Sequence, residues 1–155
     1  MKNSAKTIED LNIPQFADNQ EQSLNFFNTN GFHIEKNILT NFECENIIYN
    51  SKKFSNSINK SFEPEMQPHQ TSNLILNFMK NRKITSIVRK IISKDMKIFG
   101  LQSNFFYGIP GTTGSAQHQD GLYTSPDSPD AFISVWIPLV DINDETMGNL
   151  YVYKK

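Results

Sequence analysis

In the first part of the chain, hydrophobic residues recur every three or four positions, as they do in amphipathic helices. This pattern predicts a helix over residues 19–28, which stops at Gly31 because glycine tolerates the left-handed conformation of a helix C-cap. Thr40 and Glu43 have the spacing of a capping box and predict the start of a second helix. Two more helical patterns follow a loop, and the clearer one contains Ile84, Ile87, Val88, Ile91 and Ile92.

From residue 96 onward, the hydrophobic residues alternate with polar ones, which is the two-residue period of a β-strand. A short strand is also predicted earlier, over residues 32–38. In the segment 131–140, Ser134 and Trp136 lie on one face and the aliphatic residues on the other. The predicted strands of the second part cover residues 96–107, 117–120, 131–140 and 150–153.

Helices followed by antiparallel strands predict an α+β fold in which the strands form a sandwich or barrel. The 155 residues suffice for one domain with a hydrophobic core. We therefore expect a single domain over residues 1–155, with a mainly helical part at 1–95 and a strand-rich part at 96–155.

Charge and cysteine content narrow the class of protein. The formal net charge is -1, with 15 basic and 16 acidic side chains, so we expect neither nucleic acid nor an anionic membrane as a partner. Cys44 is the only cysteine, which excludes an internal disulfide and favours a reducing compartment. The apolar run 131–140 is too short to span a bilayer, and residues 1–14 do not have the pattern of a signal peptide. We expect a cytoplasmic protein.

His118 and Asp120 are the strongest candidates for chemistry. Residues i and i+2 of an extended segment project to the same side, so the imidazole and the carboxylate can converge on one metal ion. Two His and one carboxylate on one face of an iron octahedron leave three positions open. Of the three protein ligands in such a site, His118 and Asp120 can supply one imidazole and the carboxylate.

The other two histidines are weaker candidates. His33 forms a second His-x-acid match with Glu35, but it follows a helix stop at the start of a short predicted strand. We interpret His33 as structural or exposed. His69 lies in a loop before a helix, and we do not expect it to be a ligand.

Three segments around this motif resemble the phytanoyl-CoA dioxygenase family. They are residues 111–123 (GTTGSAQHQDGLY), residues 135–141 (VWIPLVD) and residues 147–150 (MGNL). The resemblance covers mainly residues 99–153. It implies a double-stranded β-helix, the jelly-roll or cupin-like fold, and an oxygenase that depends on Fe(II) and 2-oxoglutarate. It also implies a small-molecule substrate, which no motif identifies.

The resemblance also implies roles for single residues. His118 and Asp120 match the first two iron ligands. Trp136 matches an aromatic residue of the cosubstrate pocket, and Gln102 matches a polar position that faces cosubstrate or substrate. Tyr123 matches an aromatic residue of the substrate pocket. The alternatives are a core aromatic at Trp136, a structural hydrogen bond at Gln102 and a surface aromatic at Tyr123.

The chain departs from the family in what it lacks. The family's distal His and the Arg that binds 2-oxoglutarate have no counterpart here, and the strands after 96 are about half of the roughly eight in a jelly roll. We therefore expect an N-terminal portion of a longer protein, or a truncated reading frame, that lacks the C-terminal strands and is inactive alone. Open strand edges would permit self-association. The alternative is a non-enzymatic jelly-roll module that binds a small ligand or a partner chain.

Overall fold

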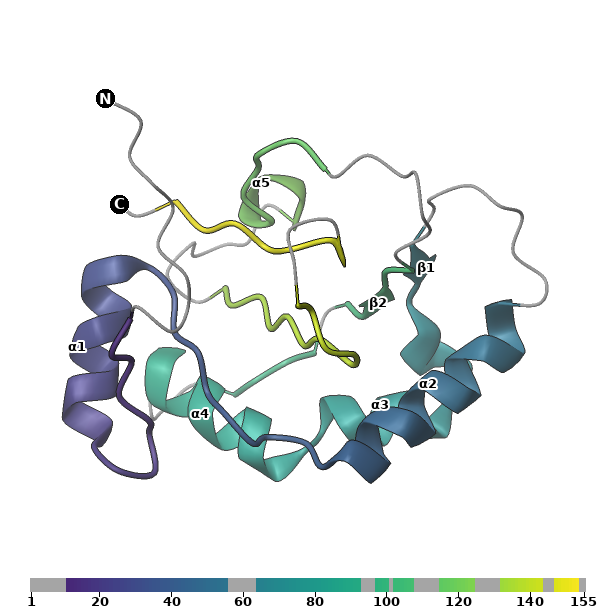
Figure 1. Ribbon diagram of the computed structural model, residues 1–155, viewed down its shortest axis with the longest axis horizontal. Coiled ribbons are helices and arrows are strands. Elements are labelled where there is room, and N and C mark those ends of the chain that lie inside the picture. Colours follow the sequence, from purple (N-terminus) through teal and green to yellow (C-terminus); the bar gives the residue numbers. More distant parts are fainter. Residues whose placement is uncertain are drawn as a thin grey trace. The chain divides into compact units, whose positions relative to one another are not determined.

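The computed structural model describes residues 11–55, 64–92, 97–100, 102–107, 115–124, 132–143 and 147–153 (Figure 1). The chain divides into two compact units, one of Met1–Asn37 with Tyr151–Lys155 and one of Ile38–Leu150. The predicted single domain stays a prediction. None of the helices in the described ranges has the length and apolarity that a membrane crossing requires.

The first unit contains helix α1, Gln20–Asn30. Its N-cap is Asn19, whose side chain accepts a hydrogen bond from the backbone N–H of Gln22, and its C-cap is Gly31 with φ of 78°. The N–H of Gly31 donates to the carbonyl of Phe27 over 2.7 Å. The predicted helix and its glycine stop are confirmed, because both ends are specified by residues next to them in sequence.

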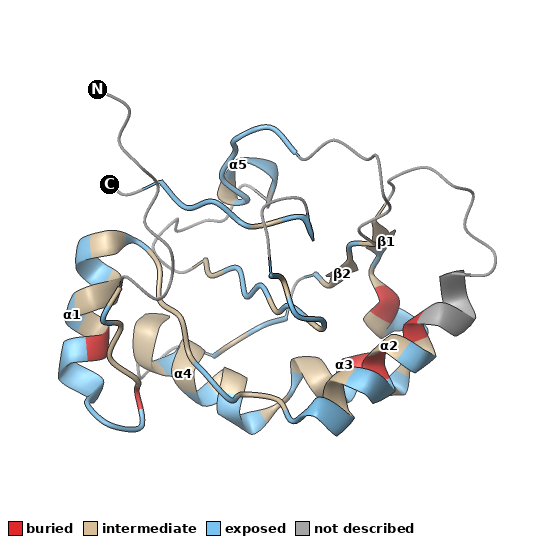
Figure 2. Cartoon of the chain, in the orientation of Figure 1, coloured by how far each residue is buried: buried red, intermediate tan, exposed pale blue. Residues whose placement is uncertain are grey.

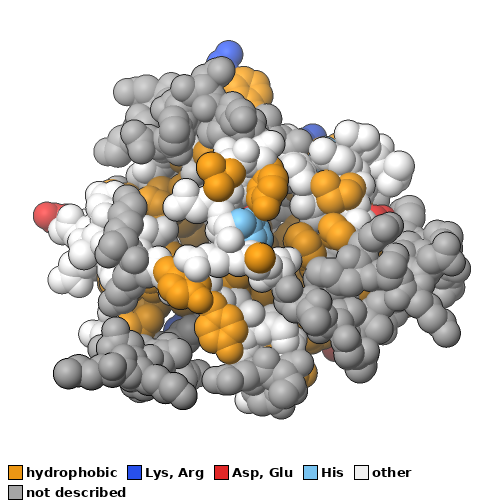
Figure 3. All heavy atoms as spheres, turned by 90° about the horizontal axis from the view of Figure 1, so that it is seen from above, with side chains coloured by type: hydrophobic (Ala, Val, Ile, Leu, Met, Phe, Trp, Pro, Cys, Tyr) orange, Lys and Arg blue, Asp and Glu red, His pale blue; other side chains and the backbone are white. Residues whose placement is uncertain are grey.

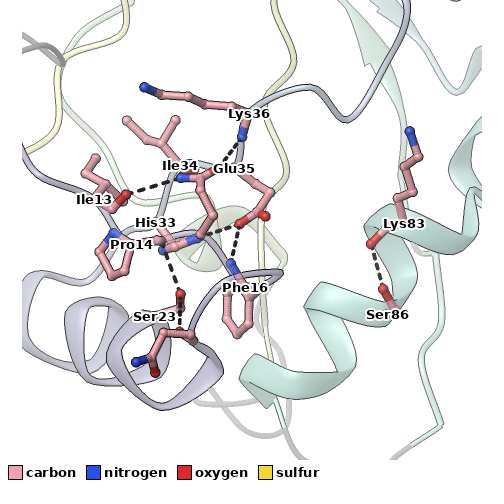
Figure 4. A network of polar contacts seen from close by, with 12 residues as sticks. Ile13, Pro14, Phe16, Ser23, His33, Ile34, Glu35, Lys36, Lys83 and Ser86 are labelled. Carbon is pink, nitrogen blue, oxygen red and sulfur yellow. Dashed lines mark hydrogen bonds and ion pairs between the residues drawn. The ribbon is translucent and has the colours of Figure 1, made fainter.

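The strand predicted over residues 32–38 is wrong, because this segment is not paired with another strand. The Gln15 side chain instead holds its backbone: Nε2 donates to the carbonyl of Ile34, and Oε1 accepts from the N–H of Lys36. The Glu35 carboxylate accepts from the backbone N–H of Phe16 over 3.2 Å (Figure 4). Side chains thus supply the hydrogen bonds that a neighbouring strand would make.

The second unit contains most of the described elements. Its helices are α2, Asn41–Ser55; η1, Pro68–Gln70; α3, Asn73–Met79; α4, Arg82–Ile92; and α5, Gly121–Thr124. Its strands are β1, Glu65–Met66, and β2, Asn104–Phe105. The helices α2, α3 and α4 confirm the helical periodicity of the sequence, whereas η1 and β1 lie in the loop predicted between the second helix and the next two.

The capping box that opens α2 is formed. The hydroxyl of Thr40 accepts from the backbone N–H of Glu43 over 3.2 Å, and the Glu43 carboxylate accepts from the Thr40 N–H over 2.8 Å. The backbone hydrogen bond and then the hydroxyl hydrogen bond from Thr40 lower the pKa of Glu43 below its ordinary value. The carboxylate form is therefore the one that holds the start of α2.

We predict that Thr40→Ala lowers the free energy of unfolding at neutral pH by about 1 kcal/mol, the usual cost of losing an N-cap side chain. Separately, because the folded-state pKa of Glu43 is lowered, the contribution of the Glu43 carboxylate to stability is present above the unfolded pKa and is lost as pH falls through the folded value. Urea denaturation at pH 7 and in acid checks both points. A conservative control, Thr40→Ser, keeps the hydroxyl and should retain most of the stability. An equal loss in both variants would contradict the capping role.

The two strands form a small antiparallel sheet. Glu65 pairs with Phe105 and Met66 with Asn104. The Tyr107 hydroxyl, just after β2, donates to the Glu65 carboxylate over 2.9 Å. Burial and then this hydrogen bond raise the pKa of Tyr107 to about 12, so the hydroxyl stays protonated and able to donate.

The long strands predicted after residue 96 are wrong in the described ranges. Only Asn104–Phe105 is a strand there; residues 132–138 and 150–153 have no assigned strand pairing, and residues 117–120 form a bend and a turn. Strand formation needs a partner for the backbone groups, and alternating hydrophobicity alone does not provide one. Helices with a small antiparallel sheet are therefore what the structure shows, and the jelly roll stays a prediction.

Few described side chains are fully buried (Figure 2). The buried hydrophobic residues are Phe16 in the first unit and Ile47 and Ile75 in the second. Many large hydrophobic side chains of the strand-rich part are exposed instead. They include Phe99, Phe106, Leu122, Tyr123, Val135, Trp136, Val140, Met147 and Leu150. Figure 3 shows that hydrophobic side chains lie at the surface on one face of the molecule. Apolar surface of this kind is typical of a face that another polypeptide segment covers.

Candidate metal centre

His118 and Asp120 meet at the surface of the second unit, directly before α5. Nε2 of His118 lies 3.3 Å from Oδ1 of Asp120. The two side chains are 38 % and 51 % exposed, so an ion from solvent can reach them. The convergence that the His-x-Asp spacing predicts is present, although the backbone here is a bend and turn and not a strand.

The hydrogen bond made by Nδ1 of His118 limits which hydrogens the other ring nitrogen, Nε2, can carry. The carbonyl of Ala116 can only accept a hydrogen bond, so Nδ1 carries a hydrogen and donates it over 2.7 Å. Nε2 then faces Asp120 either as a bare lone pair or with a proton of its own. A proton or a metal ion between Nε2 and Oδ1 would favour this approach of 3.3 Å.

The geometry fits a metal ion. Two neighbouring ligands of an octahedral first-row ion, each about 2.1 Å from it, are about 3.0 Å apart. The observed 3.3 Å between Nε2 and Oδ1 is close to this separation. The Nδ1–H to carbonyl hydrogen bond is the usual support of a histidine ligand, because it holds the ring and its tautomer. His118 and Asp120 are therefore suited to hold one ion together.

Tyr123 lies against the histidine. Its ring centroid is 5.6 Å from that of His118, in an edge-to-face arrangement. The short helix α5 places it there, because the N–H of Tyr123 donates to the carbonyl of Asp120 over 3.0 Å. Tyr123 is 76 % exposed, so its ring forms an open side of the candidate centre. Its predicted role in a substrate pocket stays a prediction.

Ser134 is a neighbour of the centre that the sequence analysis did not identify. Its hydroxyl donates to Oδ2 of Asp120 in a short hydrogen bond. The signal in the sequence was that Ser134 shares a face with Trp136 in the strand predicted over residues 131–140. Trp136 is 46 % exposed. Its predicted place in the cosubstrate pocket stays a prediction.

Gln102 is not brought to this site by its described contact. The side chain is exposed, and its Nε2 donates to Oδ1 of Asn104 over 3.1 Å. The cosubstrate-facing role of Gln102 stays a prediction. The structural alternative for Gln102 was a hydrogen bond of a buried side chain, and it stays a prediction as well.

The remaining histidines are engaged elsewhere. His33 belongs to the first unit, where Nε2 contacts the Glu35 carboxylate over 2.9 Å and only 4 % of the side chain is exposed (Figure 4). Nδ1 of His69 contacts the Ser103 hydroxyl over 2.7 Å and so ties η1 to the residue before β2. The contact and burial of His33 agree with its interpretation as a structural residue, and the expectation that His69 is not a ligand stays a prediction. In the ranges that the structure describes, no three or more His, Cys, Asp or Glu side chains are grouped to hold a metal ion.

Comparison with known proteins identifies the family. No curated protein and no solved structure matches the chain significantly. The family model described as phytanoyl-CoA dioxygenase (PhyH) matches residues 27–152, which is most of the chain and includes every candidate site residue. The suspected resemblance is thereby confirmed: the chain belongs to the phytanoyl-CoA dioxygenase (PhyH) family.

Proposed function

We propose that this chain carries the first two metal ligands of an oxygenase that uses Fe(II) and 2-oxoglutarate to hydroxylate a small organic molecule. Membership of the PhyH family supports an oxygenase-type function, since its members depend on these cofactors. The single observation that carries the assignment of the site is the contact of His118 Nε2 with Asp120 Oδ1 at 3.3 Å.

The ligand set supports iron as the metal. One imidazole nitrogen and one carboxylate oxygen are two of the three ligands in the two-His, one-carboxylate arrangement of non-haem Fe(II) oxygenases. When bound, iron and 2-oxoglutarate together supply the activation of O2. The chain's own residues hold the ion and shape its surroundings. Tyr123 and Trp136 would bury part of the bound organic molecules and exclude water from the reacting centre.

The third ligand is proposed to come from outside these 155 residues. The sequence contains three histidines, and the two besides His118 contact Glu35 and Ser103. We further propose that the remaining strands of a jelly roll accompany this ligand. They would cover exposed hydrophobic side chains such as Val135 and Leu150. Without those strands, the exposed segments of this chain could associate with a second copy of the same chain.

Anaerobic titration tests the proposal. Adding Fe(II) and 2-oxoglutarate to the full-length protein should produce a weak visible charge-transfer band, and admitting O2 should then give succinate. The 155-residue chain alone should bind iron weakly and form no succinate, because it supplies only one imidazole. The absence of both signals from the full-length protein would favour the non-enzymatic alternative, a module that binds a small ligand or a partner chain. Robust succinate formation by the short chain would refute the incomplete site.

A further inference from the structure

The Asp120 carboxylate is held from a segment distant in sequence. The hydroxyl of Ser134, in the extended residues 132–138, donates to Oδ2 of Asp120. A serine hydroxyl has a single hydrogen to donate, and a carboxylate has two oxygens that accept. The hydrogen bond therefore occupies one carboxylate oxygen and leaves the other, Oδ1, toward Nε2 of His118 at 3.3 Å.

The two candidate ligands are supported in the same way. His118 donates from Nδ1 to the Ala116 carbonyl, so the nitrogen remote from Asp120 is engaged and the near one is presented. Asp120 accepts at Oδ2 from Ser134, so the oxygen remote from His118 is engaged and the near one is presented. Each hydrogen bond limits rotation of the side chain that it holds. Together they keep Nε2 and Oδ1 facing each other without a metal ion between them.

We propose that Ser134 is a positioning residue of this metal centre. Its hydroxyl orients the Asp120 carboxylate so that Oδ1 would face the ion. This inference rests on the proposed function, because it assumes that His118 and Asp120 bind a metal. Removing the partner of a metal ligand typically lowers metal affinity about 10- to 100-fold.

The test compares two substitutions of equal shape. Ser134→Thr keeps the hydroxyl, and Ser134→Val replaces it with a methyl group. Both are β-branched residues that suit an extended, exposed position. The probe is Mn(II) added to the chain, followed by paramagnetic broadening of the histidine ring signals in NMR spectra. Broadening detects weak binding, and the rings of His33 and His69 serve as internal references.

In the unsubstituted chain, the His118 ring signals should broaden at Mn(II) concentrations that leave the other two rings sharp. Ser134→Thr should bind within a few-fold of this, and Ser134→Val should need about tenfold more Mn(II) or higher for the same broadening. Equal binding by Ser134→Thr and Ser134→Val would overturn the positioning role while leaving the metal site intact. No selective broadening of His118 in the unsubstituted chain would instead overturn the metal site itself, and the role of Ser134 with it. Unchanged chemical shifts of His69 report that the second unit remains folded in each variant.

Discussion

Under the proposed function, replacing His118 or Asp120 with alanine is expected to abolish 2-oxoglutarate turnover in a protein that carries the complete site and to lower its iron affinity more than about 100-fold. Losing a residue that only hydrogen-bonds a metal ligand already lowers metal affinity about 10- to 100-fold. The loss of a ligand itself must exceed this. Both side chains are substantially exposed, at 38 % and 51 %, so neither substitution should unfold the protein.

Iron binding is measured by the anaerobic charge-transfer band, turnover by succinate formation, and folding by circular dichroism. The matched control is His69→Ala, which removes an imidazole from the same unit but only breaks the contact with Ser103. It should leave iron affinity unchanged. Retention of turnover by His118→Ala, or an equal loss in His69→Ala, would show that the ligands have been assigned wrongly.

The second large effect concerns the small core of the second unit. Ile47→Ala is expected to lower the free energy of unfolding by about 2–5 kcal/mol, the usual cost of truncating a buried isoleucine. Ile47 is 3 % exposed and lies in α2, beside an open hollow of about 200 Å³ between α2 and α3. Removing its side chain enlarges this hollow, and few other buried side chains compensate for the lost contacts.

The control comes from the same helix. Phe42, in the first turn of α2, is 75 % exposed, so Phe42→Ala should change the free energy of unfolding by no more than about 0.5 kcal/mol. Urea denaturation followed by circular dichroism gives both values. Equal effects of the two substitutions would mean that α2 does not pack through Ile47.

Several features are encoded in residues close together in sequence. Asn19 and Gly31 delimit α1, and the Thr40–Glu43 pair opens α2, because these caps are formed by side chains and backbone groups within a few residues of each other. The approach of His118 to Asp120 is equally local. All of these were predictable without a fold.

Strand pairing was not predictable in the same way. Alternating residues suggested a long strand over 96–107, yet only Asn104–Phe105 is paired, with Glu65–Met66 far back in the sequence. The pattern of segment 32–38 also predicted a strand, but the Gln15 side chain forms hydrogen bonds with its backbone and no strand pairs with it. A period of two describes which face a residue occupies, and it says nothing about whether a partner strand lies alongside.

The candidate metal centre shows both kinds of information. Spacing along the chain is enough to bring an imidazole and a carboxylate together at His118 and Asp120, because the two residues are only two positions apart. The hydrogen bond from Ser134 required the folded chain, because it joins side chains that are 14 residues apart in the sequence. Local chemistry thus comes from neighbouring residues, whereas the orientation of that chemistry depends on contacts that form only when distant segments pack together.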